Sequence, residues 1–189
     1  MSDLVATIDT SVLISLQSAE LLGAVSVLFN RLLVPVSVRK ELTDGGERSS
    51  PALKAIDEFA IFERCDVYDR ASVDFLLQAR KQRKEGKDKG EAEAVIQAAQ
   101  HPAQMVLTDD GLGREWAEKH ARECHGTIWI CYQLRRRGFL DGLRIYFVRM
   151  LDLGRRLPLP GINGYLEEFG EALISKQEYE ERLDKTRKN

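Results

Sequence analysis

The sequence predicts an α/β fold built around a mainly parallel sheet of four or five strands. Short apolar runs typical of buried strands alternate along the chain with segments whose apolar residues recur at helical spacing. This alternation favours parallel strands joined by helices. The 189 residues, 43% of them hydrophobic, suffice for one domain with an appendage. We therefore expect an α/β domain over residues 1–150 and a helical extension over residues 151–189 that packs on it.

Five short segments are predicted as strands. The first, LVATID, ends in Asp9, and the second, RLLVP, is ended by Pro35, because proline cannot continue a sheet ladder. The last, ECHG, is expected at the edge of the sheet. The five predicted strands cover residues 4–9, 31–35, 61–67, 103–109 and 123–126.

Helical spacing fills the segments between these strands. Ser11 is expected to cap the first helix, and Ser50 and Pro51 to open the helix that begins SPALKAIDEFA. From about Asp141 the chain is helical throughout and ends in a charged tail. The predicted helices cover residues 10–19, 20–29, 36–43, 50–60, 71–83, 91–100, 111–121, 127–138, 141–154 and 163–174.

Composition excludes several classes of protein. The formal net charge of −2 does not indicate a nucleic-acid binder as a whole, although local basic patches remain compatible with one. The three cysteines form no zinc-binding pattern, and their odd number favours a reduced cytoplasmic setting. No apolar run is long enough to cross a membrane, and Asp3 stands where a signal peptide would carry basic residues.

Carboxylates follow two of the predicted strands. Asp9 ends the first strand, and Asp109 and Asp110 end the fourth, in the segment MVLTDDGLG. Because the carboxyl ends of parallel strands meet at one edge of the sheet, these side chains are expected to converge there. Glu41, on the short helix after the second strand, and Glu91, at the start of a later helix, could join them.

Several carboxylates in one cleft stay ionised together only if a cation compensates their charge, since otherwise their pKa values rise. A set of oxygen ligands without histidine or cysteine suits Mg²⁺ or Mn²⁺. Such ions commonly serve phosphoryl chemistry, because they bind phosphate oxygens and lower the pKa of water. The alternative for Glu91 is a purely structural role, in which its charge only complements the dipole of its helix.

Four segments occur in an order that resembles the PIN-domain family. They are IDTSVLISL, VPVSVRKEL, GEAEAVIQAA and VLTDDGLGREWA, and the likeness covers roughly residues 4–137. It is greatest to the compact prokaryotic PIN proteins grouped with the VapC toxins. The resemblance implies a three-layer α/β/α sandwich, a cluster of acids that binds Mg²⁺ or Mn²⁺, and hydrolysis of single-stranded RNA to a 3′ hydroxyl and a 5′ phosphate. It also implies a homodimer and, for a toxin, an antitoxin protein as partner.

The resemblance assigns roles to individual residues. It places Asp9, Glu41, Glu91 and Asp110 at the catalytic positions, with Asp9, Glu91 and Asp110 as metal ligands. Asp109 occupies a variable place, from which it either reaches the metal or caps the following helix. Many relatives carry aspartate where Glu91 stands, which puts full activity in doubt.

Three hydroxyl side chains lie next to these acids in the sequence. Thr10 and Ser11 follow the first acid, and Thr108 precedes the last. Their expected role is to orient Asp9 or a metal-bound water, and helix capping is the alternative for Thr10 and Ser11.

Basic residues near the acids are candidates for binding RNA phosphates. Lys84, Lys87 and Lys89 belong to a basic segment that leads into Glu91, and a solvated loop is the alternative. Arg114 lies one turn beyond Asp110, where it could contact a phosphate or pair with Asp110.

Two other classes of function compete with a ribonuclease. A catalytically weak or inactive PIN-like module that binds a protein or nucleic acid is compatible with Glu91 and with the helical extension. A phosphotransfer domain also uses aspartates at strand ends, but a dehalogenase-like phosphatase needs an aspartate where Ser11 stands. A receiver domain needs an acidic pair near the first strand, which this sequence does not have.

Overall fold

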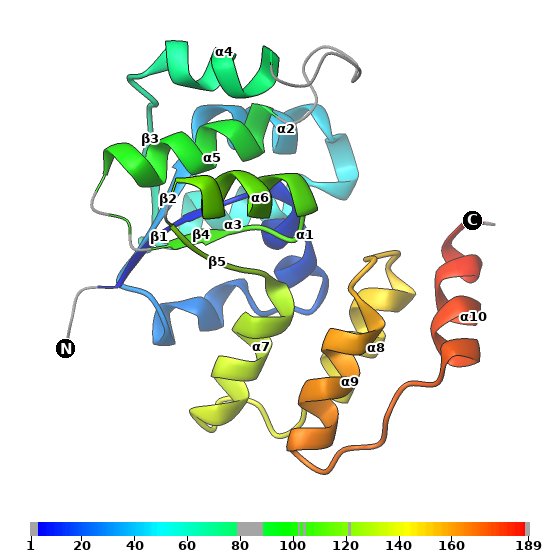
Figure 1. The fold of residues 1–189 in the computed structure, drawn as a ribbon. Coiled ribbons are helices and arrows are strands. Elements are labelled where there is room, and N and C mark those ends of the chain that lie inside the picture. The colour runs from blue at the N-terminus through cyan, green and yellow to red at the C-terminus, as the bar shows by residue number, and fades with distance from the viewer. Residues whose placement is uncertain (1–3, 79–88, 102, 104, 121, 188–189) are drawn as a thin grey trace.

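A five-stranded, fully parallel sheet forms the centre of the molecule (Figure 1). The computed structural model describes residues 4–187 except 79–88, 102, 104 and 121. The strand order is β3-β2-β1-β4-β5, so β5 lies at an edge as expected. These strands are β1 Val5–Ile8, β2 Arg31–Pro35, β3 Phe62–Cys65, β4 Met105–Leu107 and β5 Glu123–His125. The predicted α/β fold with a parallel sheet is therefore confirmed.

Helices connect the strands and continue beyond the last one. No helix in the described ranges has the length and apolar character needed to cross a membrane. The described helices are α1 Thr10–Ser18, η1 Leu22–Val27, α2 Val36–Asp44, η2 Gly46–Arg48, α3 Ser50–Glu58, α4 Arg70–Gln78, α5 Lys89–Gln100, α6 Gly111–Lys119, α7 Thr127–Arg136, α8 Arg144–Asp152, α9 Leu159–Glu168 and α10 Lys176–Arg187.

Side chains alternate between the two faces of the sheet, and each face has its own core. Along β1, Ala6 and Ile8 face the core that α1, α2, α3 and α7 cover. Val5 faces the opposite core, which α4, α5 and α6 cover. Val106 of β4 shares this second core, while its neighbours Met105 and Leu107 belong to the first. This two-residue period produces the three layers.

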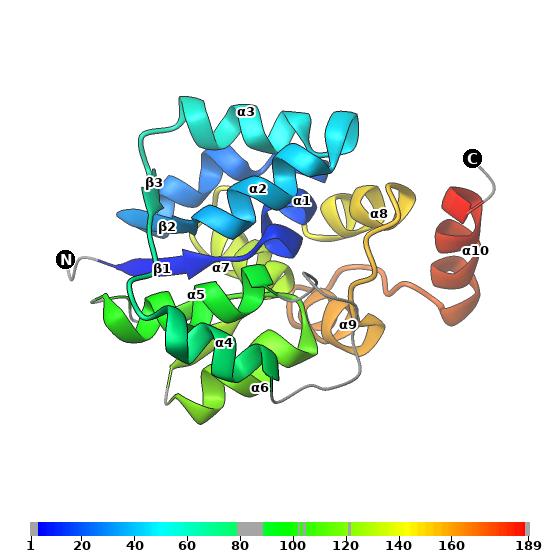
Figure 2. The ribbon, with the colours of Figure 1, turned by 90° about the horizontal axis from the view of Figure 1, so that it is seen from above.

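The C-terminal helices extend the first of these cores. Leu151, Leu157, Ile162 and Ile174 are buried in the same cluster as the residues of β1 and α7. Two perpendicular views place α8, α9 and α10 beyond the carboxyl end of β1 (Figures 1 and 2). Asp9 lies at the same end of the sheet.

Three local expectations were wrong. Asp9 rather than Ser11 is the N-cap of α1, and Ser49 rather than Ser50 is the N-cap of α3. Residues 20–29 form only the 3₁₀ helix η1. The charged tail forms α10, in agreement with the helical C-terminal part that the sequence predicts. Its Tyr179 hydroxyl donates to the carbonyl of Leu157 at 2.8 Å, which joins α10 to the segment before α9.

Candidate active site

Asp9 lies at the carboxyl end of β1 with 1% of its surface exposed. Its Oδ2 accepts hydrogen bonds from Ser11 Oγ at 2.5 Å and from Thr108 Oγ1 at 3.1 Å. Each hydroxyl in turn accepts a backbone N–H, from Asp109 at 3.2 Å and from Asp110 at 3.1 Å. Both hydroxyl protons are therefore directed at Oδ2. The other oxygen, Oδ1, is buried and has no hydrogen-bond partner among the described residues.

Glu41 lies on α2, one turn beyond the start of that helix. Its Oε2 accepts from Thr10 Oγ1 at 2.5 Å, and its Oε1 accepts from the backbone N–H of Gly90 at 3.1 Å. A Cβ atom at position 90 would lie only 2.8 Å from Glu41 Oε1, so glycine permits this close approach. The side chain is thus held from the start of α1 and from the first turn of α5.

Glu91 and Asp110 complete a group of four acids. Glu91 lies in the first turn of α5, and Asp110 is the N-cap of α6, where its Oδ1 accepts from the Leu112 N–H at 2.7 Å. The charges of Asp9, Glu41 and Asp110 all act on Glu91. The tertiary structure therefore brings together the four acids that the sequence placed on separate elements.

Burial and mutual repulsion make these carboxylates hard to ionise together. Burial raises the pKa of Asp9 to about 6, with a further contribution from the negative charge of Glu41. Burial also raises the pKa of Glu91 to about 8, followed by repulsion from Asp9. A cation among these groups would oppose both effects.

The donor set fits Mg²⁺ or Mn²⁺. The side chains that make up the site carry carboxylate and hydroxyl oxygens, and oxygen ligands are the ones these ions prefer. The buried Oδ1 of Asp9 accepts no hydrogen bond from any described residue, so this carboxylate oxygen lacks the partner that a buried polar atom normally has. Within the described ranges, His, Cys, Asp and Glu side chains do not already form a group of three or more that could hold an ion. An ion bound here would take only some of its ligands from these side chains, since Mg²⁺ usually keeps several waters.

A family model described as a PIN domain matches residues 5–171. The chain belongs to the PIN-domain family. PIN domains are generally nucleases and typically use divalent metal ions. No curated protein and no solved structure matches the chain. The matched region includes α8 and α9 and ends before α10.

Asp109, which follows the fourth strand of this PIN domain together with Asp110, is oriented differently. Its Oδ1 accepts from the Thr127 N–H at 2.7 Å, and its Oδ2 accepts from Thr127 Oγ1 at 2.6 Å. Burial raises the pKa of the Asp109 carboxyl, while the bonds from Thr127 lower it. The carboxylate thus contacts the start of α7, and its expected metal role remains a prediction.

The candidate phosphate-binding residues have neighbours of their own. Lys89 lies 3.9 Å from Glu93 Oε1 and is half-exposed. Arg114 donates to the carbonyl of Cys124 at 3.2 Å, and no ion pair joins it to Asp110 among the described residues. Lys84 and Lys87 lie outside the described residues.

The sequence did not indicate the role of Glu93. This side chain is 1% exposed, and its Oε2 accepts from Ser37 Oγ at 2.5 Å and from the Ser37 N–H at 3.1 Å. Its Oε1 accepts from Arg70 at 2.5 Å. Glu93 therefore joins α2 to α5 near Glu41 and Glu91. The spacing of Glu91 and Glu93 was the available signal, because residues two apart on a helix point to different sides.

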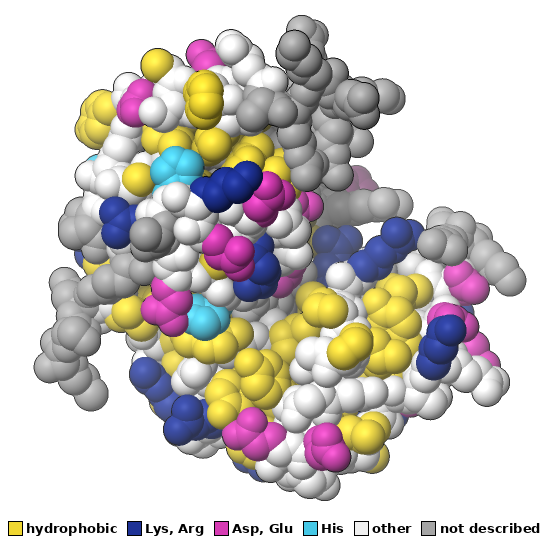
Figure 3. Space-filling model, viewed as in Figure 1, with side chains coloured by type: hydrophobic (Ala, Val, Ile, Leu, Met, Phe, Trp, Pro, Cys, Tyr) yellow, Lys and Arg dark blue, Asp and Glu magenta, His cyan; other side chains and the backbone are white. Residues whose placement is uncertain are grey.

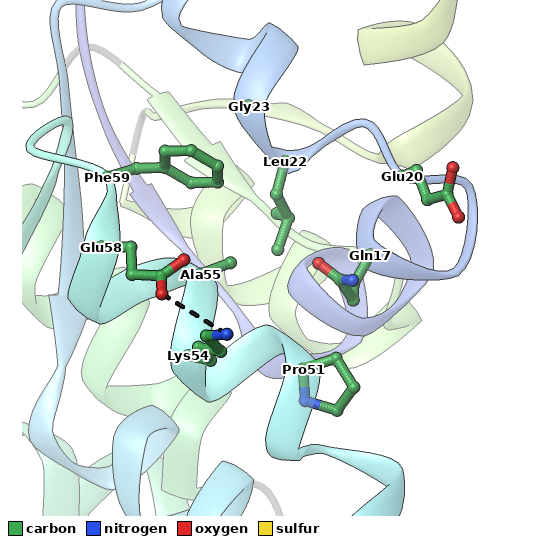
Figure 4. A pocket seen from close by; sticks show the side chains of 9 residues that line it. All are labelled: Gln17, Glu20, Leu22, Gly23, Pro51, Lys54, Ala55, Glu58 and Phe59. Atoms are coloured by element: carbon green, nitrogen blue, oxygen red, sulfur yellow. Dashed lines mark ion pairs between the residues drawn. The ribbon is translucent and has the colours of Figure 1, made fainter.

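The molecule is hollowed between the sheet layers and the C-terminal helices, with basic and acidic side chains along the margins (Figure 3). A separate hollow of about 300 Å³ lies between the end of α1, η1 and α3 (Figure 4). The acids of that second hollow are paired with cations: Glu58 lies 3.6 Å from Lys54, and Glu20 pairs with Arg149. It therefore differs from the candidate active site, where the repulsion of neighbouring carboxylates raises the pKa of Glu91.

Proposed function

We propose that this PIN domain is a divalent-metal-dependent endoribonuclease that hydrolyses phosphodiester bonds of single-stranded RNA. The observation that carries the proposal is the carboxylate of Asp9, which is fixed by two hydroxyl donors while its buried Oδ1 has no partner within the described part of the chain. The surrounding acids, Glu41, Glu91 and Asp110, supply the remaining negative charge that would attract a cation.

Asp9, Glu91 and Asp110 would hold Mg²⁺ or Mn²⁺, with Glu41 beside them. When bound, such an ion supplies positive charge for the scissile phosphate and lowers the pKa of water. Ser11 and Thr108 donate to Asp9 Oδ2, so Oδ1 would be the oxygen left to bind the ion.

The other polar groups would position catalytic groups and RNA. Thr10 and the N–H of Gly90 hold the Glu41 carboxylate toward the site, where it could accept a proton from an attacking water. Lys89 and the exposed Arg114 would draw the RNA backbone toward this acidic region by opposing the charge of its phosphates. Lys84 and Lys87, from the segment that precedes α5, are proposed to act with them.

The proposal is tested by Mn²⁺-dependent cleavage of a fluorescent single-stranded RNA. Asp9→Asn keeps the size of the side chain and removes its charge, so we expect normal folding and loss of cleavage. Glu58→Gln, an exposed carboxylate outside the site, is the matched control and should cleave as wild type does. Cleavage that survives Asp9→Asn, or a wild-type protein inactive on single-stranded RNA with Mn²⁺, would contradict the proposal.

We also propose that the ribonuclease is the cytoplasmic toxin of a toxin–antitoxin pair and acts as a homodimer. Support comes from the resemblance of its four acidic segments to the VapC group. Induced wild-type protein should then arrest bacterial growth, whereas Asp9→Asn should not, and light scattering should give the mass of a dimer. Growth unaffected by active enzyme would remove the toxin role and leave the nuclease proposal intact.

A catalytically weak binding module is the second candidate. It is favoured by Glu91 at a place where many relatives carry aspartate and by the absence, among the described side chains, of a group ready to hold an ion. RNA binding with equal affinity in wild type and Asp9→Asn, without cleavage by either, would support this alternative.

A further inference from the structure

The carboxylate of Asp109 clamps the first turn of α7. Both of its oxygens accept hydrogen bonds from Thr127, which is fully buried and is the first residue of that helix. The preceding Gly126 caps α7, and a Cβ atom there would lie 2.5 Å from Asp109 Oδ1. The side chain therefore does the capping that Gly126 cannot do.

The backbone of the same residue contacts the acid site. The Asp109 N–H donates to Ser11 Oγ at 3.2 Å, and Ser11 Oγ donates to Asp9 Oδ2 at 2.5 Å. The preceding Thr108 N–H donates to the carbonyl of His125 at 2.8 Å, which is a second link between the end of β4 and the segment that leads into α7. Asp109 thus contacts α7 through its side chain and is linked to Asp9 through its backbone N–H and Ser11.

We propose that Asp109 is a positioning residue that holds α7 against the end of β4 and, through Ser11, sets the orientation of the Asp9 carboxylate. The inference deepens the proposed function and rests on it, because the oriented Oδ1 matters only if a cation binds there. It separates two adjacent aspartates into different roles: Asp110 faces the acids, and Asp109 supports the peptide that orients Asp9.

The bonds from Thr127 already engage both carboxylate oxygens of Asp109 at the start of α7. An ion bound to Asp109 would have to share these oxygens with the Thr127 N–H and hydroxyl, and this competition would weaken bonds that a buried helix start requires. Asp109 also acts on a different set of neighbours, since its charge adds to burial in raising the pKa of the Cys131 thiol of α7. Glu91, in contrast, feels the charges of Asp9, Glu41 and Asp110.

The test measures Mn²⁺ binding directly, by the electron paramagnetic resonance signal of free Mn²⁺, on full-length protein. Asp109→Asn and Thr127→Val should each weaken Mn²⁺ binding by about tenfold, as expected for a group that orients a ligand. Thr127→Ser keeps the donor and should restore wild-type affinity. The double variant should be no weaker than either single one, because both changes break the same link.

A second cycle tests the route through Ser11. Ser11→Ala should weaken Mn²⁺ binding, and adding Asp109→Asn should cause no further loss. Thermal unfolding checks that each variant is folded, and Thr127→Val serves where Asp109→Asn does not fold. A purely structural role would lower the melting temperature and leave Mn²⁺ affinity unchanged.

Three results would overturn the inference. Unchanged Mn²⁺ affinity in folded Thr127→Val is one, and fully additive losses in the double variants are another. The third is loss of Mn²⁺ binding by Asp109→Asn alone, with Thr127→Val normal, which would make Asp109 a metal ligand. Wild-type protein that binds Mn²⁺ without cleaving RNA would refute only the ribonuclease proposal, whereas wild type that binds no Mn²⁺ would refute both.

Discussion

The hydroxyl of Thr10 donates to the Glu41 carboxylate at 2.5 Å, across 31 residues of sequence. Thr10 opens α1 directly after Asp9, while Glu41 lies on α2. The contact therefore fixes the relative position of two acids that no local segment contains together. The N–H of Gly90 holds the other oxygen of Glu41, so the carboxylate is fixed from two sides.

Removing this hydroxyl should impair the reaction without unfolding the protein. Thr10→Val keeps the shape of the side chain and should lower the RNA cleavage rate about tenfold, because Glu41 loses its orienting donor. Thr10→Ser should remain near the wild-type rate. Thr43→Val removes a hydroxyl from the exposed part of the same α2 helix and is the control. Equal rates for Thr10→Val and Thr43→Val would show that the contact does not serve the reaction.

Asp110 combines a cap with a place among the acids, and two substitutions separate these roles. Asparagine is a good N-cap, so Asp110→Asn should unfold at nearly the wild-type temperature while Mn²⁺-dependent cleavage is lost. Asp110→Ala should lose cleavage and also about 1 kcal/mol of stability, because the Leu112 N–H loses its acceptor. Thermal unfolding and RNA cleavage of both variants provide the measurement. A fully active Asp110→Asn would remove Asp110 from the site.

Glu91 should destabilise the metal-free protein at alkaline pH. Its pKa is about 8 in the fold against an ordinary value of 4.5. Ionised Glu91 therefore lowers the free energy of unfolding above pH 8. This loss shrinks as the pH falls from 8 toward 4.5, because the side chain becomes protonated in the fold. Asp9 adds a similar effect around pH 6. Glu91→Gln should therefore raise the melting temperature by about 2–4 °C near pH 9 and change it little near pH 5.5.

Added Mn²⁺ provides the counterpart to this pH experiment. A cation that compensates the acids should raise the melting temperature of wild type near pH 9, and chelation should reverse the rise. Glu91→Gln should show a smaller rise. A destabilised Glu91→Gln at alkaline pH would mean that its charge is already compensated within the protein.

Substitution of Glu93, only two residues further along α5, should destabilise the protein, in contrast to substitution of Glu91. Glu93→Ala leaves the Ser37 N–H and hydroxyl without their acceptor in a buried setting, and it removes the partner of Arg70. We expect a loss of about 2–4 kcal/mol in the free energy of unfolding by urea. Ser37→Ala should lose less, since only one donor is removed. A loss below about 0.5 kcal/mol for Glu93→Ala would show that the buried carboxylate does not join α2 to α5.

Much of the fold was predictable because it depends on local pattern. The apolar runs that end at Asp9 and at Pro35 are short enough for strands, and their neighbours have helical spacing, so a parallel sheet followed from the alternation. Because the carboxyl ends of parallel strands converge, Asp9 and Asp110 could also be grouped from their positions in the sequence.

The different contacts of neighbouring acids were not predictable in this way. Asp109 and Asp110 are adjacent and chemically identical, yet one accepts from Thr127 and the other caps α6. Glu91 and Glu93 share one helix, yet Glu93 is the one that meets Ser37. For Asp109 and Glu93 the deciding partner comes from a distant segment.

Three features follow from local pattern: the α/β class, the order of the strands along the chain and the position of Asp9 and Asp110 at the carboxyl ends of strands. They depend on hydrophobic period and on the geometry common to parallel sheets. Tertiary contacts are needed to establish which oxygen of Asp9 receives hydrogen bonds. Asp9 Oδ2 has two hydroxyl donors and Oδ1 has none among the described residues. That difference arises from donors 2 and 99 residues away along the chain, whose meeting depends on how β1 and β4 pair.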